Sequence, residues 1–216
     1  METLTLQQYV SLTEKATVLA KDSFGDKVLQ LKNGTIIKLF RCKHLFSSAL
    51  LVPYSKRFIK NAKRLNKLGI PTVFIISLWR IPAIKRTGVY YRPLQGETAR
   101  DYFSQISGEQ KKHFISKLAC FIENLHSNGI YFRSLHCGNI IETEGKEPGL
   151  IDIHDMKFYR KSLSVRLRLR NLLHFTRYKE DMALLSTEDK ELFIKVYCQQ
   201  CTAFNFPTKK ISRLFF

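Results

Sequence analysis

The chain has 216 residues, of which 44% are hydrophobic and 12% are aromatic. This composition excludes a largely disordered chain and provides enough apolar side chains for a core, in one domain or two small lobes. The N-terminus lacks a basic segment followed by an apolar run, and the longest apolar stretch, Ile70 to Trp79, has about half the length that a membrane span needs. We therefore expect an intracellular protein that is soluble or peripheral to a membrane.

The formal net charge of +18 is unevenly distributed. The segment from Lys27 to Gly96 contains no Asp or Glu, although Lys and Arg recur throughout it. A second basic cluster consists of Arg160, Lys161, Arg166, Arg168, Arg170, Arg177 and Lys179. Such a field attracts polyanions, which include nucleic acid, an anionic membrane surface and a phosphorylated substrate. The alternative is a solvated surface that only keeps the protein soluble.

The five cysteines are expected to be free thiols, because their number is odd and their spacing forms no regular framework. They are Cys42, Cys120, Cys137, Cys198 and Cys201. The pair Cys198-x-x-Cys201 has the spacing of half a zinc site or of a redox pair. No second such pair or paired His lies near it in the sequence, so packing within a helix is favoured.

The first half of the chain predicts mostly strands. Residues 17–40 have the pattern of three antiparallel strands, with a hairpin turn at Asn33-Gly34. Residues 54–68 predict a helix, because apolar side chains recur at steps of three and four residues. These side chains are Phe58, Ala62, Leu65 and Leu68. Two further strands are expected over residues 72–78 and 88–91, which makes a five-stranded sheet with one helix.

The second half predicts mainly helices. The strongest covers residues 109–126, with one apolar face formed by Phe114, Leu118, Phe121 and Leu125. Further helices are expected over 97–106, 164–178 and 187–201. We therefore predict an α+β fold with two lobes, a small β-rich lobe at 1–93 with one helix and a mainly helical lobe at 94–216. A cleft between two such lobes is a natural ligand site.

The most informative segment runs from Gly129 to Phe158 and predicts a β-hairpin with a polar residue at each end. Asn139 precedes its first strand, and Asp152 follows its second strand thirteen residues later. This spacing matches the catalytic-loop Asn and the metal-binding Asp of protein-kinase-like phosphotransferases, where both hold Mg²⁺ on the phosphates of ATP. An Asp at the end of a buried strand is costly unless it is paired or binds metal. The alternative is a purely structural hydrogen-bonding role.

A phosphotransferase also needs a cation for the phosphates, and Lys38 is the best candidate. It lies within the apolar strand Ile36–Phe40, and the alternative is an edge-strand lysine that faces water. The turn at Ser23–Asp26, where a phosphate-binding loop is expected, has one glycine, Gly25. The helix at 54–68 contains no acidic partner for Lys38, so Asn61 or Asp152 would have to position it.

Ser134 departs from the kinase pattern, because it lies five residues before Asn139, where such enzymes have the catalytic Asp. A serine cannot act as a carboxylate base near neutral pH, although its hydroxyl can still orient a substrate. His136 and Asp155 are nearby in the sequence and could replace the base, with His136 the better-placed titrating group. The alternative is a loop histidine that only hydrogen-bonds the backbone.

Two segments, Tyr131 to Ile140 and Leu150 to Met156, resemble the lipopolysaccharide core kinase group of Gram-negative bacteria, which includes the Kdo and heptose kinases. The resemblance is strongest to its small members, named toluene tolerance proteins, and extends over most of the chain. It is also carried by Lys27–Leu29, Lys38–Phe40, Asn61–Leu65, Leu68–Pro71, Tyr91–Leu94 and Arg170–His174.

This resemblance implies a protein-kinase-like fold, ATP and Mg²⁺ as cofactors, and a cytoplasmic location at the inner face of the inner membrane. It also implies phosphorylation of an inner-core sugar of lipopolysaccharide or of a lipid A–core precursor. Lys38 matches the family's ATP lysine, Asn139 its metal Asn and Asp152 its metal Asp. Ser134 falls where the active kinases have Asp.

Two other classes of function stay open. A pseudokinase would bind nucleotide, anionic lipid or a protein partner in envelope biogenesis without catalysis, as Ser134 and the missing acidic partner of Lys38 favour. A nucleic-acid-binding protein would rest on charge alone, because the sequence has no helix-turn-helix, RNP or zinc-finger pattern. We therefore expect no nucleic-acid partner.

Overall fold

The computed structural model describes residues 1–41, 53–144, 147–201 and 207–216. Its internal contacts divide it into two compact units, Met1–Leu94 and Gln95–Phe216. The first contains a six-stranded mixed sheet, and the second is mainly helical with two small sheets. The predicted α+β class is therefore confirmed. Whether the predicted lobes 1–93 and 94–216 fold as separate domains stays a prediction.

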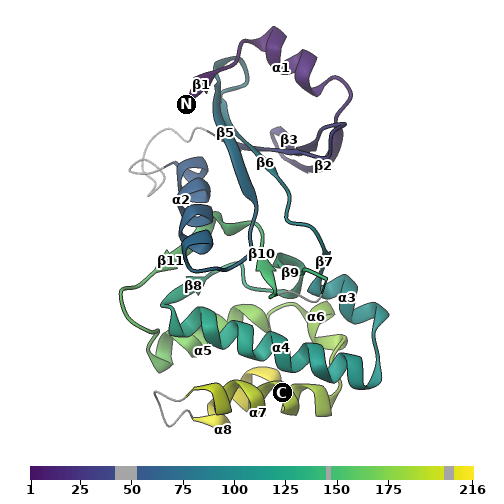
Figure 1. Cartoon of the computed structure of the whole chain (residues 1–216), viewed down its shortest axis with the longest axis vertical. Coiled ribbons are helices and arrows are strands. Elements are labelled where there is room, and N and C mark those ends of the chain that lie inside the picture. Colours follow the sequence, from purple (N-terminus) through teal and green to yellow (C-terminus); the bar gives the residue numbers. More distant parts are fainter. Residues whose placement is uncertain (42–52, 145–146, 202–206) are drawn as a thin grey trace. The chain divides into compact units, whose positions relative to one another are not determined.

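The first unit is built around its sheet, whose strand order is β1-β5-β6-β4-β3-β2. Only β1 joins its neighbour in parallel, and all other pairs in this sheet are antiparallel. Figure 1 shows α2 beside this sheet. The elements are β1 (Glu2–Thr3), α1 (Leu6–Thr13), β2 (Thr17–Asp22), β3 (Gly25–Gln30), β4 (Ile36–Arg41), α2 (Tyr54–Lys67), β5 (Phe74–Ile81), the 3-10 helix η1 (Pro82–Ile84) and β6 (Arg86–Arg92).

The hairpin between β3 and β4 confirms the predicted turn. Gly34 has φ +77°, a conformation that glycine adopts readily, and the side chain of Asn33 accepts a hydrogen bond from the backbone of Thr35 at 3.1 Å. On α2, Phe58, Ala62 and Leu65 are buried as predicted.

Three predictions for the first unit are wrong. Leu68 is 44% exposed, because α2 ends at Lys67 and Leu68 caps it instead of continuing its apolar face. The sheet has six strands, since β1 adds to the edge at β5. A second helix, α1, begins with a capping box between Thr5 and Gln8 and has no buried residue. Apolar periodicity therefore did not reveal it.

The second unit begins with β7 and ends with a group of helices. Its sheets are the three-stranded β10-β9-β7 and the two-stranded β11-β8. The elements are β7 (Glu97–Thr98), α3 (Ala99–Gln105), α4 (Gly108–Ser127), β8 (Ile130–Phe132), η2 (Cys137–Asn139), β9 (Ile140–Glu142), β10 (Gly149–Leu150), η3 (Ile153–Asp155), β11 (Met156–Phe158), α5 (Val165–Phe175), α6 (Lys179–Ala183), α7 (Thr187–Gln200) and α8 (Thr208–Phe215).

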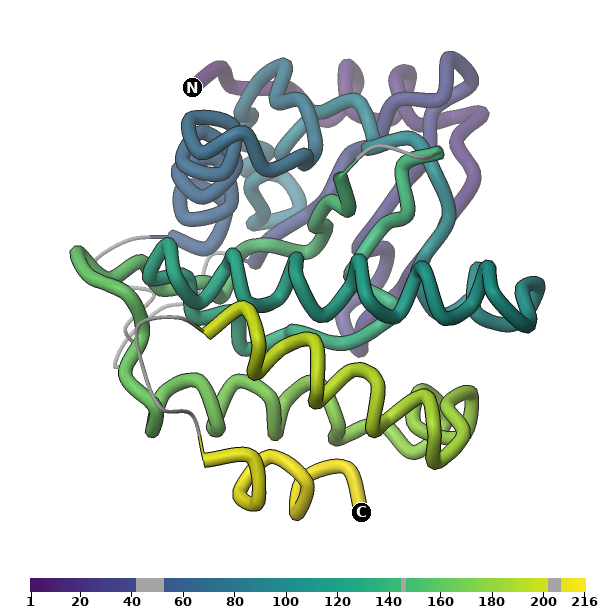
Figure 2. Tube along the Cα trace, turned by 60° about the horizontal axis from the view of Figure 1, so that its bottom comes forward, coloured from purple at the N-terminus to yellow at the C-terminus, as the bar shows by residue number. Residues whose placement is uncertain are grey.

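The core of the second unit lies between α4 and the later helices. The four predicted apolar residues of α4 are all buried, which confirms its periodicity. Figures 1 and 2 both show α7 along α4, and α8 contacts both α7 and α5. The rings of Phe175 on α5 and Phe193 on α7 stack with centroids 5.4 Å apart. No helix in the described ranges has the length and apolarity to cross a membrane.

The cysteines in the described ranges are free thiols, as predicted: Cys120, Cys137, Cys198 and Cys201. Cys42 lies outside the described residues. Cys198 is on α7 and Cys201 caps the end of this helix, where it is buried. Burial raises the pKa of the Cys201 thiol to about 11, so it is protonated at neutral pH. This supports packing for the pair.

Candidate functional site

The predicted hairpin brings Asn139 and Asp152 together in the second unit. Strands β9 and β10 pair antiparallel with Leu150 opposite Ile140, and the backbone of Ile151 donates a hydrogen bond to the carbonyl of Asn139 at 3.1 Å. Asp152 therefore follows directly after the residue that pairs with Asn139. The thirteen-residue spacing read from the sequence thus corresponds to adjacent positions at one end of the hairpin.

Asp152 has an unusual backbone conformation at the start of η3. Its φ of 50° lies in the left-handed region, which is uncommon for residues other than glycine and is found often at functional sites. One carboxylate oxygen, Oδ1, lies 2.7 Å from His154 Nδ1. The Asp152 side chain keeps 31% exposure. A ligand in solution can therefore reach this carboxylate.

Asn139 is held by its amide nitrogen, which leaves its oxygen available. Nδ2 donates to the carbonyl of Ser134 at 2.9 Å and also contacts His136 Nε2 at 2.9 Å. Among the described residues, Oδ1 of Asn139 accepts no hydrogen bond. Because the loop fixes the amide group, this oxygen has a set direction and is a suitable ligand for a hard cation.

Ser134 forms a pair with Asp155, a contact that the sequence spacing did not reveal. Ser134 Oγ donates a hydrogen bond to Asp155 Oδ2 at 2.7 Å. The pair forms because β8 and β11 are antiparallel, with Met156 opposite Phe132, so the residues just beyond this ladder meet. Asp155 Oδ1 is buried and has no hydrogen-bond partner in the described part of the chain. A carboxylate therefore lies directly behind the serine hydroxyl.

His136 is occupied by loop contacts, which favours the alternative that sequence reasoning left open. Its Nδ1 accepts a hydrogen bond from the backbone of Gly138 at 3.1 Å, and its Nε2 contacts the Asn139 amide. Burial lowers the pKa of His136, so the ring is neutral at pH 7. Asp155, and not His136, is therefore the better-placed group to act with Ser134.

Two residues from later helices hold this loop, and sequence reasoning missed the role of both. Asn171 on α5 accepts from the backbone N–H of Phe132 at 3.2 Å and donates to its carbonyl. Asp181 on α6 is fully buried, accepts from the backbone N–H of Cys137 at 3.0 Å and pairs with Arg100. The segment between Phe132 and Cys137 is thus fixed at both ends. Asn171 lies in a segment that carries the family resemblance, whereas no pattern marks Asp181.

Three exposed arginines lie around His174, close to the Ser134–Asp155 pair. Burial lowers the pKa of His174, and the positive charges of Arg177, Arg133 and Arg170 lower it further, whereas Asp155 raises it. The His174 ring lies 2.9 Å from the hydroxyl of Tyr131 on β8. This group of cations favours an anion beside His174.

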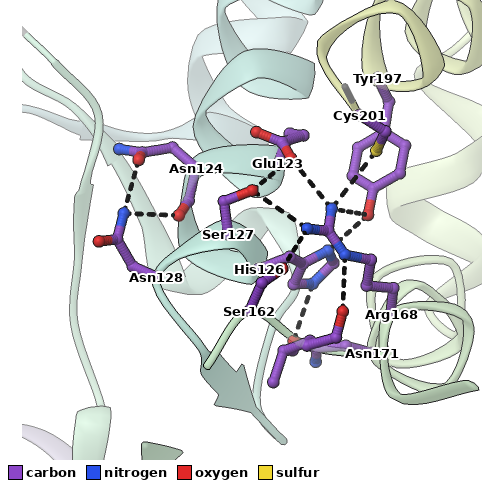
Figure 3. A network of polar contacts seen from close by, with 11 residues as sticks. Glu123, Asn124, His126, Ser127, Asn128, Ser162, Arg168, Asn171, Tyr197 and Cys201 are labelled. Atoms are coloured by element: carbon purple, nitrogen blue, oxygen red, sulfur yellow. Dashed lines mark hydrogen bonds and ion pairs between the residues drawn. The ribbon is translucent and has the colours of Figure 1, made fainter. Parts of the chain in front are cut away.

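Arg168 does not belong to this exposed group, which corrects the predicted basic cluster. It is fully buried, and Figure 3 shows it at the centre of a polar network between α4, α5 and α7. Its guanidinium donates to Glu123 Oε1 at 3.0 Å, and its remaining partners satisfy the other nitrogens. These partners are Leu163, Ser162, Ser127, Tyr197 and Cys201.

Lys38 and Gly25 belong to the first unit. Lys38 is only 6% exposed on β4, which lies between β3 and β6, so the alternative of a water-facing edge lysine is wrong. Its ammonium nitrogen lies 5.7 Å from the centre of the Phe58 ring. Asn61, the predicted polar neighbour of Lys38, is buried on α2.

The turn with Gly25 joins β2 and β3, and Gly25 has φ +108°. The buried Arg86 side chain fixes this turn by donating to Asp22 Oδ1 at 3.0 Å and to the carbonyls of Phe24 and Asp26 at 2.8 Å. Sequence reasoning did not identify Arg86. A single arginine therefore organises the turn at which a glycine-rich loop would be expected.

No cluster of three or more His, Cys, Asp or Glu side chains with metal-binding geometry occurs among the described residues. The pair Asn139 and Asp152 is a smaller donor set of one amide oxygen and one carboxylate. No family model and no curated protein matches the chain. The resemblance to the lipopolysaccharide core kinases therefore stays a prediction.

Proposed function

We propose that the protein is an ATP- and Mg²⁺-dependent phosphotransferase with a protein-kinase-like fold that phosphorylates an inner-core sugar of lipopolysaccharide. The observation that carries the proposal is the hairpin that sets Asn139 beside Asp152, with Ser134 bonded to Asp155 on the same loop. The acceptor class, and a cytoplasmic location at the inner membrane, come from the family resemblance. The family resemblance implies a phosphate-binding role for Lys38, and the contacts that support the proposal all lie within the second unit.

The donor set at the hairpin fits magnesium. Asn139 Oδ1 and the Asp152 carboxylate would hold the ion, and Mg²⁺ commonly uses one or two carboxylates together with substrate phosphates and water. When bound, Mg²⁺ would neutralise charge on the phosphates of ATP, which phosphoryl transfer requires.

The Ser134–Asp155 pair offers a substitute for the missing catalytic Asp. An acceptor hydroxyl that donates a hydrogen bond to Ser134 Oγ can pass its proton to that oxygen while Ser134 passes its own proton to Asp155 Oδ2. The acceptor oxygen then attacks the γ-phosphorus, the bond to the β-phosphate oxygen breaks, and Asp155 is left as a neutral acid. Ser134 orients the acceptor and Asp155 takes the proton, so the two share the role of one carboxylate.

The arginines around His174 support an anionic acceptor. Arg133 follows directly after β8, and Arg170 and Arg177 come from the α5 region, so cations from two segments act on His174, on which Asp155 also acts. Glycolipids of the lipopolysaccharide core carry negative charge, as the family resemblance implies for this acceptor. The second candidate function is a pseudokinase, which the serine at position 134 favours.

The test is a thermal-shift titration of the purified chain with ATP, with and without Mg²⁺. At a hundredfold excess over Kd, the ligand stabilises the protein by about 2.7 kcal/mol. For a chain of this size that corresponds to about 5 to 10 °C. We expect this shift in the wild type only with Mg²⁺, and we expect Asp152→Asn to abolish it.

Glu147→Gln is the matched control, because Glu147 is an exposed carboxylate on the same hairpin connection. It should keep the full shift. A thermal shift of the same size in Asp152→Asn would show that Asp152 does not take part in binding Mg²⁺ and ATP. Mg²⁺-dependent binding without transfer of phosphate to phosphatase-treated rough lipopolysaccharide would favour the pseudokinase.

A further inference from the structure

Helix α2 in the first unit carries a continuous basic face. Lys56, Lys60, Lys63 and Lys67 follow at steps of four, three and four residues, which places them on one side of the helix. All four are exposed. At a rise of 1.5 Å per residue, the row is about 16 Å long. The side chains of Phe58, Ala62 and Leu65 face the core instead, so the basic face is the outer side of a packed helix.

This face borders a groove. A cavity of about 400 Å³ lies between α2 and β5, and Ile59 and Leu78 give it two apolar side chains. Figure 1 shows α2 next to β5 in the sheet. The remaining lining residues are all basic: Lys56, Lys60, Lys63, Arg64 and Lys67. The groove is therefore lined by five cations and two apolar side chains.

The charges of this face are not compensated within the helix. Helix α2 contains no acidic residue, and none of the four lysines forms an ion pair with any described residue. The pairs Lys56/Lys60 and Lys63/Lys67 are like charges at a spacing of four residues, an arrangement that destabilises a helix. An anionic partner would reduce this repulsion between lysines, and this reduction would favour its binding to the face.

We propose that the α2–β5 groove is a docking site for the surface of an anionic bilayer, with the lysines on phospholipid phosphates and Ile59 and Leu78 against the apolar boundary. A row about 16 Å long reaches several headgroups at once. The two apolar side chains distinguish this surface from a purely electrostatic site for nucleic acid. The inference does not depend on the proposed phosphotransfer.

The test is co-sedimentation of the full chain with vesicles of equimolar phosphatidylcholine and phosphatidylglycerol, compared with vesicles of phosphatidylcholine alone. We expect binding only to the mixed vesicles. Each lysine near an anionic surface contributes about fivefold in affinity, so the triple variant Lys56→Gln, Lys60→Gln, Lys63→Gln should lose on the order of a hundredfold. Glutamine is a good helix former and removes the repulsion, so the variant should melt no lower than the wild type.

The matched control removes the same charge elsewhere, through Lys195→Gln, Lys209→Gln and Lys210→Gln, which are exposed positions on α7 and α8. It should keep most of the binding. An equal loss of vesicle affinity in the control would overturn the proposal, because the net charge of the whole protein would then explain the binding. If the triple variant folds poorly, the single variant Lys60→Gln should bind the mixed vesicles with about fivefold lower affinity. An unchanged affinity would overturn the proposal.

Two further measurements test whether the groove binds free phosphate or nucleic acid instead of a bilayer. Displacement from the vesicles by millimolar inorganic phosphate would indicate a site for free phosphate and overturn membrane docking. Binding of a short DNA duplex that is lost in the triple variant, without binding to the mixed vesicles, would assign the groove to nucleic acid and also overturn it. Vesicle binding that withstands phosphate and is lost only in the α2 variants would support the proposal.

Discussion

The second unit contains two polar clusters that differ in how completely their groups are satisfied. Around Arg168, every guanidinium nitrogen has a partner, and the network is closed within the core (Figure 3). At the hairpin, Asp155 Oδ1 is buried without a partner among the described residues, and Asp152 has φ 50°. Polar groups that only stabilise a fold are normally saturated, whereas strained or unsatisfied groups mark places reserved for a ligand or for chemistry.

The largest effect on stability is expected from breaking the polar network around Arg168, which we call the closed cluster. Arg168→Met removes the cation but fills similar space, so Glu123 is left as a buried charge without its partner. We expect a loss of about 3 to 5 kcal/mol in the free energy of unfolding, measured by urea denaturation. Arg166→Met on the exposed side of α5 should change stability by less than about 0.5 kcal/mol. A small loss for Arg168→Met would mean that the network is not structural.

The polar cluster at the hairpin, with Ser134, Asp152 and Asp155, is the open cluster. Substitutions in it should change activity more than stability. Asp155→Asn is expected to lower Mg²⁺-dependent ATP turnover about a hundredfold or more, with water or the rough lipopolysaccharide as acceptor, because the proton can no longer reach a carboxylate. Its unfolding free energy should change by no more than about 1 kcal/mol. A loss of less than twofold in turnover would exclude Asp155 from the reaction.

Exchanging the two residues sharpens this result. The double variant Ser134→Asp, Asp155→Asn moves the carboxylate to the position of the serine and leaves an amide that can donate to it. We expect turnover at least tenfold above that of Asp155→Asn. Ser134→Asp alone sets two carboxylates side by side and should be less active than the double variant. Absence of recovery, with Mg²⁺–ATP binding intact, would show that the pair does not handle the proton.

The last expected effect concerns the pH dependence of the free energy of unfolding, through His126 near Arg168. Burial and the nearby Arg168 lower the pKa of His126 to about 3, so the folded protein keeps this ring neutral. The unfolded chain binds the proton near pH 6.5, so stability is complete above that pH and falls as the pH decreases. Between pH 7 and pH 5 we expect a loss of about 2 kcal/mol from this residue. In His126→Gln the pH slope of the unfolding free energy should decrease accordingly, and an unchanged slope would exclude His126 as its source.

The sequence predicted those features that depend on local pattern. The periodicity of Phe114, Leu118 and Phe121 identified α4, and the apolar strands identified the hairpin that joins Asn139 to Asp152. Both signals arise within a short stretch of chain. They can therefore be recognised in the sequence without knowledge of the tertiary structure.

The features that were missed depend on distant contacts. The Ser134–Asp155 pair forms only because β8 and β11 are paired, and Arg168 is a basic residue in a basic stretch whose burial requires Glu123 from another helix. Helix α1 begins with a cap and buries no residue, so apolar spacing gave no signal for it. Tertiary context decided these cases, because the residue types alone were compatible with either outcome.

The supports of the Ser134 loop also determine when it can form during synthesis. The backbone of Phe132 is held by Asn171, 39 residues later, and that of Cys137 by Asp181, 44 residues later. A ribosome releases the chain from its N-terminal end at about 5 to 20 residues per second. The loop therefore emerges several seconds before its anchors, and a nascent chain that ends before α5 contains every proposed catalytic side chain without either anchor of the loop.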